Sequence, residues 1–229
     1  MRHYLAAALL VVAAATGMDA ADSLTFQGMI ATYSGEGTLR LGTPVADYLY
    51  TLVISGPTNA TGRTGTLRIK PKNASIRNAV FIDTIYSALP VNIDVKFPPG
   101  LAQASYVRNI YINGPSDSIK ITGGDLGAPE AEDGRVLING ELGTLKVSGR
   151  TYNVPNTTLT EWWGGNVWAD IYVYGPLKKL QIKGGDLHYD PHGGILGSIT
   201  TLGDIGSIMV EGYAVKTNRS MPLTKLMFG

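Results

Sequence analysis

Five aromatic residues lie close together in the second half of this chain, and their side chains could bind a sugar. They are Trp162, Trp163, Trp168, Tyr172 and Tyr174, and they include all three tryptophans of the sequence. Flat aromatic faces beside polar groups offer large contact area at little entropic cost, which suits neutral sugars. The alternative is a loop folded over the wall of the protein, in which the indoles cover apolar surface.

One polar segment combines residues of the types that ligate transition metals. His188, Asp190 and His192 bring two imidazoles and a carboxylate into the loop 188–194. These groups suit zinc and similar ions, but their spacing in a loop with Pro and Gly matches no recognised ligand pattern. A solvated loop is therefore the preferred interpretation of this segment.

An acidic segment is the second candidate for a metal site. Glu130, Glu132 and Asp133 lie in the loop 127–134, and their carboxylates are the hard oxygen ligands that Ca2+ prefers. The EF-hand pattern is absent, and three acids beside a proline also fit a loop that faces water. We therefore expect no cofactor, with Ca2+ in this loop as the alternative.

Motifs that would identify a reaction are absent from the sequence. It contains no nucleophile elbow, P-loop, dinucleotide fingerprint or HExxH. Asp125 and Asp186 stand at equivalent points of two Gly-Gly-Asp-Leu phrases, where Asp commonly bonds its own backbone in a turn. We therefore favour a non-enzymatic protein, with two carboxylates paired only in space for glycoside hydrolysis as the alternative.

The composition indicates a folded protein with many turns and a weakly charged surface. Of 229 residues, 44 % are hydrophobic and 16 % are charged, with 29 Gly, 12 Tyr and no Cys. The formal net charge is +1, whereas nucleic acid and anionic lipid call for a clustered basic surface. We expect neither partner, and without disulfides the stability must come from packing and backbone pairing.

The first residues predict export. Arg2 and His3 precede an unbroken apolar run from Leu5 to Ala15, and small residues follow, which is typical of a signal peptide over 1–20. The run is shorter than the roughly 20 apolar residues that cross a bilayer. We therefore expect a secreted or cell-surface protein without a membrane span in the mature chain.

Comparing the chain with itself reveals a repeat. The stretch Asn109–Leu126 reads NIYINGPSDSIKITGGDL, and the stretch Asp170–Leu187 reads DIYVYGPLKKLQIKGGDL, at an offset of 61 positions. The similarity continues in LGTLKVSG from Leu142 and IGSIMVEG from Ile205, now at an offset of 63. Self-similarity of this kind is the signature of repeat architectures.

Each repeat unit predicts short strands rather than helices. Leu145 and Val147, like Ile208 and Val210, alternate with polar or small residues, which places the branched side chains on one face of a strand. Glycine follows most of these strands and permits a sharp corner. An all-β fold results, either a coil of stacked parallel turns or a sandwich of antiparallel hairpins.

The repeat favours the coil, because stacking copies places the same residue type at the same point of successive turns. The phrases LGTLKVSG, GSITTLGDIGSIMVEG and IKGGDL resemble the repeats of exported bacterial right-handed parallel β-helix proteins. That resemblance implies a right-handed parallel β-helix and carries no catalytic residues with it. Polysaccharide lyases of β-helix fold often use Ca2+, which is where the acidic loop would matter.

These inferences combine into one expected organisation. A signal peptide over 1–20 is followed by an N-terminal cap or irregular β segment over 21–50 and by a β-helix repeat domain over 51–229. The leading hypothesis is an exported structural or adhesive protein that self-associates where an end of the solenoid lacks a cap. A carbohydrate-active enzyme and a glycan-binding module are the alternatives, and polysaccharide is the expected partner of both.

Overall fold

The computed structural model describes residues 22–43, 49–57, 60–76, 78–98, 105–128, 134–153, 160–186, 198–213 and 226–228. Every regular element in these ranges is a β-strand, so the described part of the chain is all-β. The expected signal peptide lies outside the described residues. None of the described residues form a helix with the length and apolarity that crossing a membrane requires.

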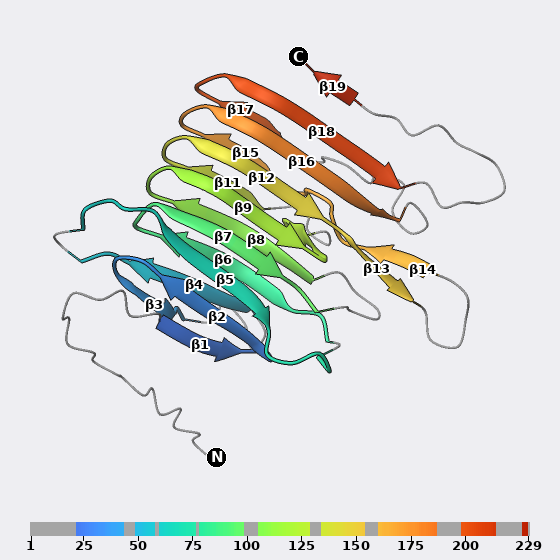
Figure 1. The fold of residues 1–229 in the computed structure, drawn as a ribbon, viewed down its shortest axis with the longest axis horizontal. Helices are drawn as coiled ribbons and strands as arrows, with labels where there is room; N and C mark the ends of the chain where they lie inside the picture. Colours follow the sequence, from blue (N-terminus) through green and yellow to red (C-terminus); the bar gives the residue numbers. More distant parts are fainter. Residues whose placement is uncertain are drawn as a thin grey trace.

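The described strands form two large sheets and one small one (Figure 1). The nine strands of the first sheet are, in spatial order, β1 (Asp22–Phe26), β2 (Met29–Ser34), β5 (Gly65–Pro71), β7 (Val91–Lys96), β9 (Ser116–Thr122), β12 (Leu142–Ser148), β16 (Leu177–Asp186), β18 (Ile205–Tyr213) and β19 (Leu226–Phe228).

The second sheet has eight described strands, seven of them in one path. That path runs β17 (Ile199–Thr201), β15 (Asp170–Val173), β11 (Arg135–Ile138), β8 (Ser105–Ile112), β6 (Phe81–Ser87), β4 (Leu49–Ser55) and β3 (Thr38–Leu41), and β10 (Gly124–Leu126) also pairs with β8. A separate antiparallel hairpin consists of β13 (Arg150–Asn153) and β14 (Thr160–Trp163).

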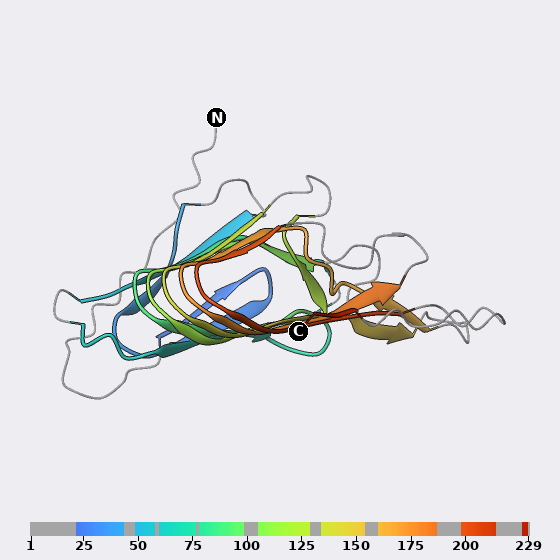
Figure 2. The ribbon, with the colours of Figure 1, turned by 90° about the horizontal axis from the view of Figure 1, so that it is seen from above.

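The chain passes repeatedly from one large sheet to the other. From β4 to β9 successive strands alternate between the sheets, and the alternation resumes from β15 to β18. Every neighbouring pair within this region is parallel, from β4 with β6 to β16 with β18. Antiparallel pairs occur at the two ends, in β1–β2, β2–β5, β3–β4 and β18–β19. Figure 2 shows the two sheets facing each other, joined by a series of similar turns.

The core lies between the sheets and consists of in-register rows. In the first sheet, Ile121 pairs with Val147, and Val147 pairs in turn with Ile182. All three side chains are fully buried, and each contributes about 1.5–3 kcal/mol by leaving water. Ile121 and Ile182, 61 positions apart, therefore belong to the same row but are separated by one intervening strand.

The structural unit is consequently shorter than the offset found in the sequence. Ile119 pairs with Leu145, 26 positions later, and Leu145 pairs with Leu180, 35 positions later. The longer step contains the β13–β14 hairpin as an insertion. The sequence signal for the shorter unit is the phrase Ile-Asn-Gly, which occurs at 112–114 and again at 138–140.

The segment 21–50, expected to be a cap or irregular, contains β1, β2, β3 and the start of β4. Its apolar side chains close one end of the core, because Phe26, Met29 and Tyr33 are buried. The Tyr33 hydroxyl donates a hydrogen bond to the Glu36 carbonyl at 2.7 Å, which satisfies its polar end.

Glycine at the corner between the two sheets permits the close approach of successive turns. Gly140 has φ of 155°, and a Cβ atom placed on it would lie 2.9 Å from the backbone nitrogen of Pro115 in the preceding turn. A side chain there would push apart two backbones that the strand pairing holds together. Gly62 has φ of 76°, but a Cβ atom on it would meet no atom within 4 Å.

We expect Gly140→Ala to lower the free energy of unfolding by about 2–4 kcal/mol, since it adds a backbone collision to a backbone conformation that disfavours Ala. Gly62→Ala carries the conformational cost alone and should lower it by about 1–2 kcal/mol. Urea denaturation of both variants measures the difference. Equal losses would contradict the proposed collision between stacked turns.

Candidate functional site

The outer face of the second sheet carries a row of large side chains. Tyr86 of β6 pairs with Tyr111 of β8, which pairs with Leu137 of β11, and Leu137 pairs with Tyr172 of β15. The row faces outward because the residues that precede its members along these strands, such as Ile85 and Ile110, are fully buried.

The corner that follows these strands adds amide groups beside the aromatic row. The Asn139 backbone N–H donates to the Ile112 carbonyl, and the Tyr174 backbone N–H donates to the Ile138 carbonyl, each at 2.9 Å. These bonds continue the strand pairing into the corner and set Asn113, Asn139 and Tyr174 in successive turns. The Asn139 Nδ2 group donates to Asn113 Oδ1 at 2.9 Å.

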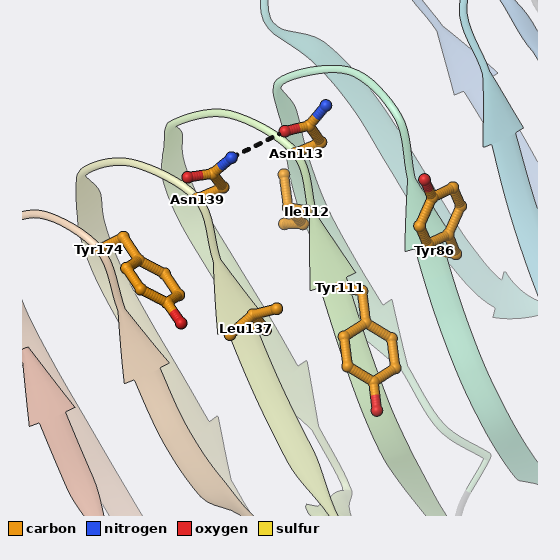
Figure 3. A pocket seen from close by; sticks show the side chains of 7 residues that line it. All are labelled: Tyr86, Tyr111, Ile112, Asn113, Leu137, Asn139 and Tyr174. Carbon is orange, nitrogen blue, oxygen red and sulfur yellow. Dashed lines mark hydrogen bonds between the residues drawn. The ribbon is translucent and has the colours of Figure 1, made fainter.

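Together these side chains form an open pocket of about 300 Å3. Its lining residues are Tyr86, Tyr111, Ile112, Asn113, Leu137, Asn139 and Tyr174, which come from four successive turns (Figure 3). We call this pocket the tyrosine–asparagine groove. Tyr86 is 43 % exposed and Tyr174 is 55 % exposed, so both rings present faces to a ligand from outside.

The chemistry of the groove suits a neutral, hydroxyl-rich ring. Figure 3 shows Asn113 Nδ2 and Asn139 Oδ1 directed away from the bond between the two amides, so one can donate and the other can accept. Leu137 supplies an apolar floor, and the tyrosines supply flat faces and hydroxyl groups. The described lining contains no charged residue, which favours a neutral ligand over an ionic one.

The predicted aromatic residues divide between different environments. Of the five, Tyr174 lines the groove. Tyr172 lies in the outer row but is not part of the lining, and the Arg135 guanidinium carbon lies 5.8 Å from the centre of its ring. That contact is a cation–π interaction, so Arg135 occupies one face of the Tyr172 ring.

The tryptophans belong to other segments than the residues that line the groove. Trp162 and Trp163 belong to β14, opposite Thr151 and Arg150 in β13, and their side chains lie outside the described residues. Trp168 is 7 % exposed, and its Nε1 donates to Asp125 Oδ2 at 3.5 Å. A buried indole offers little surface to a ligand from outside, and the binding role of Trp168 stays a prediction.

Asp125 anchors the segment that contains Trp168. Its carboxylate is 2 % exposed and accepts the backbone N–H of Asn166 at 2.8 Å as well as the Trp168 indole N–H. The same segment pairs through its backbone, since the Trp168 N–H donates to the Leu126 carbonyl at 2.7 Å. Asp125, expected to be a turn residue, thus lies in β10 and holds an incoming segment. The side chain of Asp186 lies outside the described residues.

The metal-ligand candidates fall outside the described part of the chain. This holds for Glu130, Glu132 and Asp133 in one loop and for His188, Asp190 and His192 in the other. Among the residues that the structure describes, no three His, Asp or Glu side chains gather as a cation site would require.

Two side chains that form polar contacts between turns, Asp170 and Lys178, have shifted pKa values. The pKa of Asp170 is lowered because its carboxylate accepts the Ser198 backbone N–H at 2.8 Å and the Ser198 hydroxyl at 2.7 Å. Its charged form therefore supports the last turn above the ordinary pKa of Asp, and that support is lost as the pH falls through the lowered value. The ion pair with Glu141 raises the pKa of Lys178.

Comparison of this chain with protein-family models, with curated proteins and with solved structures finds no match.

We expect Asp125→Ala to lower the free energy of unfolding by about 2–4 kcal/mol, because the Asn166 and Trp168 N–H groups lose a buried acceptor. Asp117→Ala, which removes an exposed carboxylate from β9 of the first sheet, is the control and should cost less than about 1 kcal/mol. Thermal and urea unfolding measure both changes. A neutral Asp125→Ala variant would show that the segment is held by its backbone alone.

Proposed function

We propose that this chain is an exported, non-enzymatic adhesive or structural protein built as a right-handed parallel β-helix. The proposed coil is supported by the alternation of strands between two sheets and by the series of parallel pairs in the two large sheets, from β4 with β6 to β16 with β18. Right-handed winding is inferred from the strong preference of parallel crossover connections for that hand. The basic start and apolar run of the sequence support export.

The observation that carries the adhesive role is the tyrosine–asparagine groove. Tyr86 and Tyr111 lie on neighbouring strands, and Asn113 and Asn139 lie in neighbouring turns, so each pair repeats at the strand spacing of about 4.8 Å. A neutral glycan is itself a linear repeat of flat, hydroxyl-bearing rings, so it can contact successive turns with the same kind of group. We infer that a neutral glycan lies across Tyr86, Tyr111 and Tyr174 and bonds to the two asparagines.

Substitution of Tyr174, with substitution of Tyr172 as the control, tests this role. We expect Tyr174→Ala to weaken glycan binding by about tenfold, because the most exposed ring of the groove is lost. Tyr172→Ala is the control, since it removes an aromatic ring that lies outside the groove. A neutral-glycan array identifies the ligand, and titration calorimetry measures the affinities.

Three outcomes would contradict this part of the proposal. The first is an array on which the whole chain binds no neutral glycan. The second is equal binding by the Tyr174→Ala variant and the unaltered chain. The third is loss of binding only in a Trp162→Ala/Trp163→Ala variant, which would move the site to the β13–β14 hairpin. Shortening of a polysaccharide during incubation, with or without Ca2+, would overturn the non-enzymatic assignment.

Self-association at the C-terminal end is a further part of the proposed function. Phe26 and Met29 are buried at the N-terminal end, whereas Ile199, Ile208 and Val210 in the last turn are only half-buried. Among the described strands, β17 pairs on one side only, with β15. An unpaired strand edge beside partly exposed apolar residues is a template for another chain.

We expect light scattering to show a mass that rises with protein concentration. Thr200→Lys should return the protein to a monomer, because Thr200 is exposed in β17 and a charge at this strand edge opposes pairing with a second chain. Thr66→Lys, a substitution on the outer face of the first sheet, is the control and should leave the mass unchanged. A strict monomer at high concentration would contradict self-association.

A further inference from the structure

The outer face of the first sheet concentrates cations, although the whole chain is nearly neutral. Lys120 of β9 pairs directly with Lys146 of β12. Lys146 pairs with Gln181 of β16, and this glutamine is flanked along its strand by Lys179 and Lys183. We call these four residues the lysine cluster.

The lysine cluster points away from the core. The residues that alternate with it, including Ile121, Val147 and Ile182, are fully buried in the rows described above. Lys120 and Lys179 are exposed, and Lys146 and Lys183 are half-buried. The charges therefore lie on one face of three adjacent strands, about 4.8 Å apart from strand to strand.

Acidic residues lie at the borders of the cluster. Asp94 pairs with Lys120 on one side, and Glu211 pairs with Lys183 on the other. At the start of β16, Lys178 forms an ion pair with Glu141. Lys146, at the centre, has a lysine opposite it on one strand and a glutamine flanked by lysines on the other.

The lysine cluster lowers the stability of the sheet, so its presence is better explained by a binding role than by a role in folding. Like charges directly opposite each other on neighbouring strands destabilise a sheet, and a lysine opposite a lysine is such a pair. A bound polyanion would relieve the repulsion and release its own counterions. We propose that the lysine cluster binds an acidic polysaccharide, with carboxylates along the glycan chain engaging Lys120, Lys146 and the lysines of β16.

The surroundings favour a polysaccharide over a membrane. The outward residues beside the cluster include the polar Thr122, Thr144 and Gln181, and the one apolar neighbour among the described pairs is Met209, opposite Gln181 on β18. Protein surfaces that lie on membranes combine lysines with Trp, Phe or Leu, which enter the lipid. A narrow row of cations across three strands also matches a single polymer chain better than a wide nucleic-acid duplex.

The test measures binding of the whole chain to polygalacturonate, with neutral dextran as the reference polymer. We expect binding to polygalacturonate alone, and we expect its affinity to fall as salt rises. Lys120→Gln/Lys146→Gln should weaken it by about tenfold and reduce the slope of log affinity against log salt by about one for each lysine removed. The thermal midpoint of this variant should stay equal or rise, because a like-charge pair is removed.

Lys70→Gln is the matched control, since it removes one exposed lysine from β5 of the same sheet, away from the cluster. Equal weakening by Lys70→Gln and Lys146→Gln would overturn the proposal in favour of general charge attraction. Failure to bind polygalacturonate would also overturn it, as would tighter binding to phosphatidylserine vesicles or duplex DNA. Tyr174→Ala should leave this binding unchanged, which separates the lysine cluster from the tyrosine–asparagine groove.

Discussion

Backbone pairing between successive turns is the interaction on which the other features of this protein depend. In the two large sheets the pairs from β4 with β6 to β16 with β18 are parallel, and the register of the core rows places branched side chains directly beside one another. Because side chains alternate along a strand, this register also determines the outward rows. The Tyr86–Tyr111 pair and the Lys120–Lys146 pair are therefore consequences of the same alignment that buries Ile85 and Ile121.

Much of the architecture could be predicted from the sequence, because its causes are local. Alternating branched residues and glycine corners predict short strands, and the copy at Asn109–Leu126 predicts that Ile121 and Ile182 share a row. The strand that contains Leu145 and Val147 was predicted, but its place between β9 and β16 in the same row was not, since the comparison at 61 positions passes over it. Its turn differs in length from its neighbours because it carries the β13–β14 hairpin, and this difference conceals the shorter unit.

The candidate site was harder to predict because its residues come from different turns. Tyr86, Asn139 and Tyr174 are far apart in sequence and become neighbours only when the register is known. The tryptophans are closer together in sequence and predicted a binding site at a different place. In the structure Trp168 is buried, and its indole N–H donates to Asp125. Aromatic residues lie close together in sequence both in buried segments and at binding surfaces, so this pattern does not distinguish the two. The repeated Ile-Asn-Gly phrase was the available sequence sign of the asparagine pair.

The β13–β14 hairpin has an evolutionary consequence. It lengthens one turn, yet the rows on either side stay aligned, with Leu145 still opposite Leu180. The chain thus leaves the stack and returns to it without altering the pairing that stabilises the fold. That corner can accept segments of varied length and sequence, so descendants of this gene could acquire new recognition loops there while their scaffold stays the same.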